Sequence, residues 1–136
     1  MSGMHEGGCL CGRIRFRVTG DPVRTSVCHC AFCQRRSGSA FAVLPFFKAE
    51  AVEMTGEAPA TYRHVSDESG RWLEIEFCPR CGTNTGLRVE RAPQGRILAG
   101  GCFDDPGWFR VDRHIWTRSR RDWVALPADC VLEEKG

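Results

Sequence analysis

Several features common in globular sequences are scarce in this chain of 136 residues. Of its 19 lysine and arginine residues, only Lys48 and Lys135 are lysines, and the arginines are spread along the whole chain. No apolar run approaches the about 20 residues that a membrane helix needs. The longest covers residues 41–47 and contains a proline. The first residues lack a cationic stretch followed by an apolar one, so the sequence predicts no secretory signal.

Strong charge of one sign is also missing. The formal net charge is +2, which does not make nucleic acid the default partner. With 42% apolar and 26% charged residues, the composition excludes a disordered tail, a collagen-like repeat and a long coiled coil. No repeat or linker interrupts the chain, so we expect one domain over residues 1–136. Without an export signal, we expect a cytoplasmic protein in a reducing compartment and no membrane partner.

Cysteine is the residue type in clear excess, with nine copies. Because disulfides are rare in reducing compartments, clustered cysteines favour metal binding. Seven of the nine fall into three tight groups, which are Cys9 and Cys11, then Cys28, Cys30 and Cys33, then Cys78 and Cys81. The other two, Cys102 and Cys130, we interpret as small buried apolar side chains.

Alternation of apolar and polar residues with a period of two dominates the chain and predicts short strands. It is clearest in residues 13–18, where arginines alternate with apolar residues, and in residues 72–77, where glutamates do. Weaker strand candidates cover residues 23–28, 41–47, 51–55, 61–65, 86–90, 96–100 and 114–117. One short helical turn is expected around residues 32–37. The sequence predicts a small all-β domain of short antiparallel strands, to whose stability bound metal would contribute.

Cys78 and Cys81 have the spacing of a zinc knuckle. Two intervening residues let a tight turn aim both sulfurs at one ion, and the glycine after the second cysteine permits close backbone approach. The remaining ligands follow from the strand pattern. Antiparallel pairing of residues 13–18 with 72–77 would set arginines opposite glutamates. It would also bring Cys9 and Cys11 beside Cys78 and Cys81, as a closed structural zinc site.

Cys28, Cys30 and Cys33 supply three thiolates within six residues, with no obvious fourth cysteine. Three protein ligands with one open position is the arrangement of catalytic zinc, which is our leading interpretation. A closed site and the absence of a stable metal are the alternatives, and the candidate fourth ligands are His29, His64, Cys102 and Cys130. His29 lies between two ligands, so its ring is expected to point away from their metal. An iron–sulfur cluster is disfavoured, because it normally takes four cysteines.

Taken in order, these motifs resemble the glutathione-dependent formaldehyde-activating (GFA) family, which also contains the relatives of centromere protein V. The matching stretches are GGCLCGRIRF at 7–16, CHCAFCQRRSGSAF at 28–41 and FCPRCGTNTG at 77–86. Looser matches are AGGCFDDPGWF at 99–109 and RHIWTRSRRDW at 113–123. Three separated cysteine motifs in the correct order make this resemblance specific.

The resemblance implies a small β-tent of sheets stapled by metal. It also implies two zinc ions, a structural one on Cys9, Cys11, Cys78 and Cys81 and a second one on Cys28, Cys30 and Cys33 beside a substrate cleft. The family's named activity joins formaldehyde to glutathione and gives S-hydroxymethylglutathione, a carbon–sulfur lyase reaction run in the synthetic direction. The implied partners are therefore glutathione or another small thiol and a small aldehyde.

The leading hypothesis for the mechanism is zinc-assisted addition of a thiol to an aldehyde. Three thiolates give the second site a net negative charge, so thiolate transfer is an equal alternative to polarisation of the aldehyde. Arg35 and Arg36 follow Cys33 and are candidates to clamp a glutathione carboxylate, and Ser37 and Ser39 are candidates to add hydrogen bonds. The rival hypothesis is a non-catalytic zinc-binding module for nucleic acid or a protein partner.

The basic segment at residues 110–121 would serve the rival hypothesis. It holds five arginines and one aspartate, and aromatic residues lie nearby. Such a combination can contact phosphates and stack bases. Two of these aromatic residues, Trp108 and Phe109, lie in a loop with proline and glycine and are also candidates to line a pocket.

Overall fold

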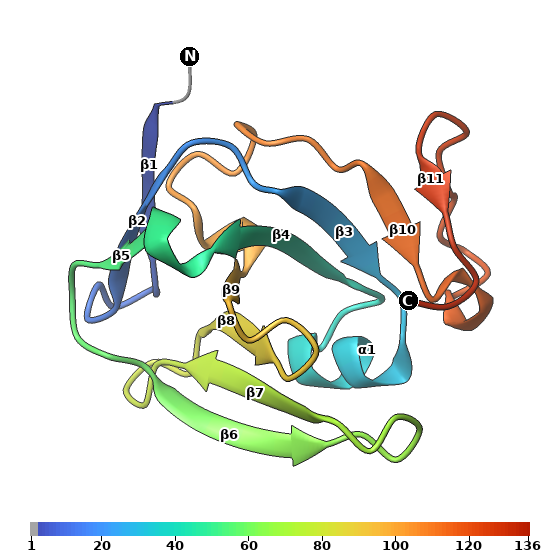
Figure 1. Cartoon of the computed structure of the whole chain (residues 1–136), viewed down its shortest axis with the longest axis horizontal. Coiled ribbons are helices and arrows are strands. Elements are labelled where there is room, and N and C mark those ends of the chain that lie inside the picture. Colours follow the sequence, from blue (N-terminus) through green and yellow to red (C-terminus); the bar gives the residue numbers. More distant parts are fainter. Residues whose placement is uncertain (1–2) are drawn as a thin grey trace.

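The computed structural model describes residues 3–136, which form two β-sheets and one α-helix (Figure 1). No helix among these residues is both long enough and apolar enough to cross a membrane. The elements in chain order are β1 Met4–Gly8, β2 Arg15–Thr19, β3 Arg24–Cys28, α1 Ala31–Ser37, β4 Ala42–Lys48, η1 Ala49–Ala51, β5 Val52–Met54, β6 Ala60–Val65, β7 Trp72–Phe77, β8 Asn84–Val89, β9 Gly95–Leu98, η2 Gly100–Cys102, β10 Arg113–Ile115, η3 Thr117–Ser119 and β11 Val131–Leu132.

The smaller sheet has the order β1-β2-β5, and the larger sheet has the order β11-β10-β3-β4-β9-β8-β7-β6. Neighbouring strands are antiparallel except at β10, which runs parallel to both β3 and β11. The predicted all-β class with short, mainly antiparallel strands is confirmed. The helical turn expected around residues 32–37 is α1.

The predicted pairing of the two most regular strands is wrong. β2 lies between β1 and β5 in the smaller sheet, and β7 lies between β6 and β8 in the larger one. The charged side chains of residues 13–17 and of β7 form other ion pairs, namely Arg13 with Glu57, Arg15 with Asp104, Arg17 with Glu6, Glu74 with Arg63 and Glu76 with Arg96. A strand with arginines on one face is compatible with any neighbour that offers carboxylates, so alternation alone does not select the partner.

Apolar packing joins the two sheets. Phe16 on β2 packs with Phe47 on β4 and Leu98 on β9, and these side chains are almost completely buried. Phe103, which belongs to the same cluster, also forms an isolated β-bridge with Gly7 of β1. Because no continuous ladder of hydrogen bonds crosses between the sheets within residues 3–136, other cross-links there have a large share in the stability.

The helix α1 lies against the inner face of the larger sheet, between β4 and β7 (Figure 1). Its one buried residue, Cys33, packs with Leu44, Leu87 and Ile97 from three of the strands. The seven-residue helix is too short to be stable alone, so this packing holds it in place. The sheet thereby fixes the loop from β3 into α1, which carries the central cysteine motif.

Candidate metal centres and functional site

Four cysteine sulfurs from distant parts of the chain gather where the two sheets meet. The Sγ atoms of Cys9 and Cys11 lie 3.6 Å apart, and those of Cys11 and Cys78 lie 3.7 Å apart. With Cys81 they form a group whose sulfurs all lie within 4.8 Å of one another. A tetrahedral zinc ion with bonds of about 2.3 Å would hold its sulfurs about 3.8 Å apart. The four cysteines that the sequence assigns to one site are thus brought together with a geometry that fits zinc.

The turns around these cysteines aim hydrogen-bond donors at the sulfurs. The backbone N–H of Ile14 donates to Cys9 Sγ at 3.2 Å, and that of Cys81 donates to Cys78 Sγ at 3.4 Å. The Thr83 hydroxyl lies 3.1 Å from Cys81 Sγ, and hydrogen bonding to Thr83 lowers the pKa of Cys81 to about 5. Donors of this kind favour the thiolate, which is the form that binds metal.

A glycine follows the second cysteine in each half of the site. Gly12 has a φ of 80° and Gly82 has a φ of 79°, both in the left-handed region that other residues rarely adopt. A side chain added at either position would meet no neighbouring atom, so the backbone conformation, rather than space, requires glycine. The two turns are therefore matched halves, one from the β1–β2 connection and one from the β7–β8 connection.

The second cluster is local in the chain. Cys28 ends β3, Cys30 caps α1, and Cys33 lies in the first turn of α1. The Sγ atoms of Cys28 and Cys30 are 3.3 Å apart, and all three sulfurs lie within 4.8 Å of one another. Cys28 and Cys33 are buried, whereas Cys30 is half-buried. A metal ion fits between the three sulfurs, and the cluster reaches solvent on the side of Cys30.

Without a metal, the three thiols hold their protons unequally. Hydrogen bonds from Cys28 and Cys33 lower the pKa of Cys30 to about 3. The pKa of Cys28 is raised by its hydrogen bonds with Cys30 and Cys33 and by burial. At Cys33 the hydrogen bond with Cys28 acts downward, but Cys30 and burial raise the pKa to about 11. One thiolate thus lies beside two thiols, and a bound cation would displace both remaining protons.

Side chains behind the cluster fix the loop that carries it. The Gln34 side-chain amide donates to the carbonyl oxygen of His29 at 2.7 Å and to that of Ser119 at 3.0 Å. The His29 ring is fully buried and turned toward His114, whose Nδ1 lies 2.9 Å from His29 Nε2. Burial lowers the pKa of both imidazoles. As predicted, His29 points away from the cluster, and its ring is not among the grouped ligand atoms.

No fourth cysteine, histidine or carboxylate joins this cluster among residues 3–136. The His64 ring stacks on Phe32 of α1, with 5.1 Å between ring centroids. Cys102 Sγ donates to the carbonyl oxygen of Asn84, and burial raises the pKa of Cys102 to about 11. Cys102 and Cys130 are both half-buried, rather than fully buried as the sequence suggested. The proposed closing ligands are therefore engaged elsewhere or lie outside the cluster.

The four residues predicted to bind substrate lie in different settings. Arg36 is half-buried, and its Nη1 donates to Asn84 Oδ1 at 2.9 Å. Arg35 and Ser39 are exposed. The Ser37 hydroxyl donates to the Cys33 carbonyl at 2.7 Å and closes the end of α1. Sequence reasoning missed Asn84, because 48 residues separate it from Arg36 and no spacing rule connects them.

Carboxylates pair with two of the five arginines in the basic segment at residues 110–121. Arg113 pairs with Asp112 at 2.9 Å and with Glu133 at 3.6 Å, and Arg118 pairs with Glu68 at 3.2 Å. The guanidinium groups of the two arginines that follow, Arg120 and Arg121, donate to backbone carbonyl oxygens. Arg110, Arg120 and Arg121 are exposed and form no ion pair within residues 3–136, so the segment keeps part of its positive charge.

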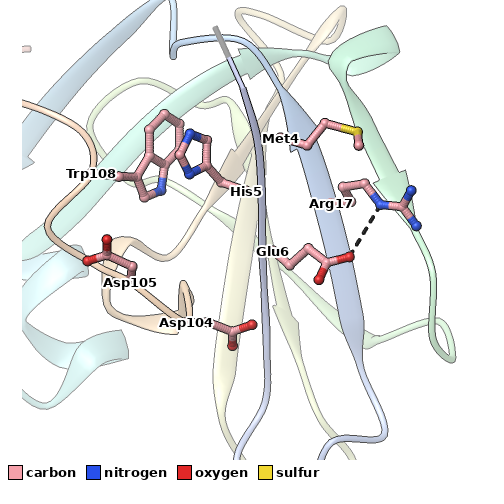
Figure 2. Close-up of a pocket in the computed structure, with 7 residues that line it drawn as sticks. All are labelled: Met4, His5, Glu6, Arg17, Asp104, Asp105 and Trp108. Atoms are coloured by element: carbon pink, nitrogen blue, oxygen red, sulfur yellow. Dashed lines mark ion pairs between the residues drawn. The ribbon is translucent and has the colours of Figure 1, made fainter.

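Two cavities lie away from the cysteine clusters. One, of about 490 Å³, is lined by Met4, His5, Glu6, Arg17, Asp104, Asp105 and Trp108. Figure 2 shows the ring of His5 flat against the indole of Trp108, and the two ring centroids are 3.7 Å apart. The other, of about 330 Å³, is lined by Asp21, Pro22, Thr25, Trp108, Phe109, Arg110 and Asp112. The expectation that Trp108 and Phe109 line a pocket is confirmed, but neither cavity includes a cysteine.

Comparison with known proteins agrees with these two clusters. The family model of the glutathione-dependent formaldehyde-activating enzyme matches residues 4–119, which include all seven clustered cysteines. A protein of Halomonas elongata carries the provisional name of a glutathione-dependent formaldehyde-activating enzyme. It is 23% identical over 133 residues, which cover 89% of this chain and 80% of that protein.

Among solved structures, a Rhodobacter sphaeroides protein has a similar fold. Its crystal structure aligns with a TM-score of 0.57 and 19% identity, covering 73% of this chain and 87% of that chain. At this level of identity the likeness bears on the fold alone. Because the family model spans most of the sequence, from β1 to η3, the chain belongs to the glutathione-dependent formaldehyde-activating enzyme family.

Proposed function

We propose that this protein is a zinc-dependent enzyme of the carbon–sulfur lyase type that adds a small thiol, such as glutathione, to a small aldehyde, such as formaldehyde. One observation carries the proposal: three cysteines converge at the β3–α1 junction, and no fourth ligand joins them among residues 3–136. Three protein ligands with one free position are typical of a catalytic metal, whereas four cysteines are typical of a structural one. The cytoplasm is the proposed location, because reduced thiols are abundant there.

Zinc bound by Cys28, Cys30 and Cys33 would supply a fourth coordination position and Lewis acidity for a thiolate or a carbonyl oxygen. The β3–α1 junction holds the three ligands in place. The Gln34 side chain supports this junction by donating to the carbonyl oxygens of His29 and Ser119. In the addition, the thiol sulfur forms a bond to the aldehyde carbon, and the thiol proton ends on the aldehyde oxygen. The reaction therefore needs no oxidant or reductant.

The proposed substrate-binding residues follow the cysteines directly. Arg36 has no carboxylate partner among the ion pairs of residues 3–136, so its charge is free to attract a carboxylate of the thiol substrate. Arg35 is exposed and provides a second cation. Ser37 and Ser39 complete the proposed set around the end of α1.

The test uses formaldehyde labelled with carbon-13 and glutathione, with the rate of adduct formation measured by exchange NMR. The zinc-loaded protein should speed the approach to equilibrium, and Cys30→Ser and metal-depleted protein should not. Cys130→Ser is the matched control, since Cys130 belongs to neither cluster. If fully zinc-loaded protein gave only the uncatalysed rate, the protein would be a non-catalytic zinc-binding module instead.

A further inference from the structure

Arg36 lies close in the chain to the three-cysteine cluster. It lies in the last turn of α1, three residues after Cys33, so both side chains emerge on the same face of the helix. Its guanidinium carbon lies 5.9 Å from the ring centroid of Phe32. The charged group is therefore held against α1 on the side of the three-cysteine cluster, not extended freely into solvent.

No carboxylate of residues 3–136 pairs with Arg36. Its Nη1 donates to the neutral amide oxygen of Asn84 at 2.9 Å, and its Nε is buried with no hydrogen-bond partner in residues 3–136. Arg15 and Arg96, by contrast, each form two hydrogen bonds to a carboxylate. A half-buried guanidinium normally finds an acid, because burial of an unpaired charge is unfavourable. The missing acid is a feature that an anionic ligand would supply.

Asn84 is well placed to fix this group. It is the first residue of β8 and follows Cys81 by three residues, so the four-cysteine site anchors its backbone. Its carbonyl oxygen accepts a hydrogen bond from Cys102 Sγ at 3.5 Å. Asn84 thus ties Arg36 to the most strongly cross-linked part of the molecule.

We infer that Asn84 is a positioning residue that holds Arg36 beside the three-cysteine site, and that the pair makes this site select thiols that carry a carboxylate over uncharged thiols. The inference rests on the proposed function and deepens it by naming the substrate class. A neutral amide suits this role, because it accepts a hydrogen bond from the guanidinium without cancelling its charge. An aspartate in the same place would bind Arg36 more strongly and would compete with the substrate.

The experiment compares glutathione with 2-mercaptoethanol, which has no charge. For each thiol, KM and kcat for addition to formaldehyde are measured on the zinc-loaded protein. Thiol binding is measured separately, from the visible absorption of the cobalt-substituted protein. The variants are Asn84→Ala, the isosteric Asn84→Asp, and Arg36→Ala. Arg24→Ala is the control, since it removes another arginine that lies 5.5 Å from a phenylalanine ring, that of Phe46.

Wild type should prefer glutathione, and Arg36→Ala should weaken glutathione binding about tenfold, as expected for a charged hydrogen bond. Asn84→Ala should also raise KM for glutathione, with little change in kcat. Asn84→Asp should raise KM for glutathione more than Asn84→Ala does. Binding of 2-mercaptoethanol and the results with Arg24→Ala should not change. If Asn84→Ala loses zinc, it no longer reports on Arg36. Glutathione binding and KM in Arg36→Ala and Asn84→Asp then test the inference.

Equal losses for both thiols in the Asn84 variants would mean a purely structural contact and would overturn the inference. Unchanged glutathione binding in Asn84→Asp and Arg36→Ala would overturn it too. In both cases the proposed function stands if wild type still binds and converts thiols. If wild type neither binds nor converts either thiol, the proposed function fails, and the inference fails with it.

Discussion

The two cysteine clusters use the same ligand chemistry in opposite ways. In the four-cysteine site, Cys11 and Cys78 are 67 residues apart, and their turns belong to different sheets. In the three-cysteine site, all ligands lie within six positions around one strand end and one short helix. By loop-closure entropy alone, the longer closure stabilises the fold by roughly 2 kcal/mol more than the shorter one. The first cluster is thus suited to hold the protein together, and the second to take part in chemistry.

The largest expected effect comes from breaking the cross-link between the sheets. Cys81→Ser should lose one zinc and unfold most of the domain. The binding energy of a structural zinc, about 10–16 kcal/mol, is as large as the whole stability of a typical domain. Metal analysis and circular dichroism of the purified variant are the measurements.

Cys102→Ser is the control for that change, because Cys102 is a half-buried cysteine outside both clusters. It should retain both metal ions and lose at most about 1 kcal/mol, through its single weak hydrogen bond. A Cys81→Ser protein with full metal content and an unchanged melting temperature would contradict the structural role of the four-cysteine site.

The next largest effect should be on activity rather than stability. Cys30→Ser removes the half-buried ligand of the three-cysteine site and leaves the contacts between the sheets untouched. We expect at least about 100-fold slower thiol addition, as for loss of a metal-bound reacting group. One zinc should remain bound, and the melting temperature should fall by only a few degrees. Global unfolding of this variant would show that the two sites do not divide their roles.

The two sites should also differ in how easily they lose metal. Cys11 of the four-cysteine site is exposed, but only the three-cysteine site has no fourth protein ligand among residues 3–136, so a chelator should empty the three-cysteine site first. Its thiolates should also be the first to oxidise in air. Mass spectrometry under native conditions, during titration with EDTA, should show a species with one zinc before the metal-free one. Simultaneous loss of both ions would contradict this order.

The smallest effect concerns a buried ion pair outside both clusters. It provides a measurement of stability that does not depend on metal. Burial raises the pKa of Glu76, although Arg96 lies 2.6 Å away and acts against that shift. A carboxyl whose pKa is higher in the folded state than in the unfolded state stabilises the fold fully at a pH below its unfolded pKa. That stabilisation is lost as the pH rises through the folded pKa. Relative to Glu76→Gln, wild type should therefore lose stability as pH rises from about 4.5 through the folded pKa of Glu76.

Urea unfolding of the zinc-loaded proteins at several pH values measures this difference. If wild type instead gained stability relative to Glu76→Gln with rising pH, attraction by Arg96 would outweigh burial. The folded pKa of Glu76 would then lie below the unfolded one. Neither result should alter the order in which the two metal sites are emptied.

Local patterns in the sequence predicted the elements well, because those patterns depend on near neighbours. The knuckle at Cys78 and Cys81 and the alternation in residues 72–77 both correspond to what the structure contains. The pairing of strands was predicted wrongly, since the arginines of residues 13–17 pair with carboxylates on loops and on β1 instead of on β7. The four cysteines nevertheless meet, because the turns that carry them come together without a shared ladder.

What the sequence could not show depends on contacts between distant residues. The strand β1, with the sequence MHEGG, has no alternation of apolar and polar residues. Its one buried residue is Gly7. At Gly7 any side chain would collide with the backbone of Cys102 and Phe103. The hydrogen bond that Arg36 donates to Asn84 likewise forms only because the fold brings β8 and α1 together. Such contacts follow from the fold and leave no spacing in the sequence.

The division between the two clusters is tested most directly by zinc-edge X-ray absorption of the fully loaded protein, before and after addition of glutathione. With four cysteines at one site and three at the other, the average number of sulfur ligands per zinc should be about three and a half before glutathione is added. It should rise to about four as the thiol enters the open position. A fourth protein ligand at the three-cysteine site, with no gain of sulfur at saturating glutathione, would contradict the account.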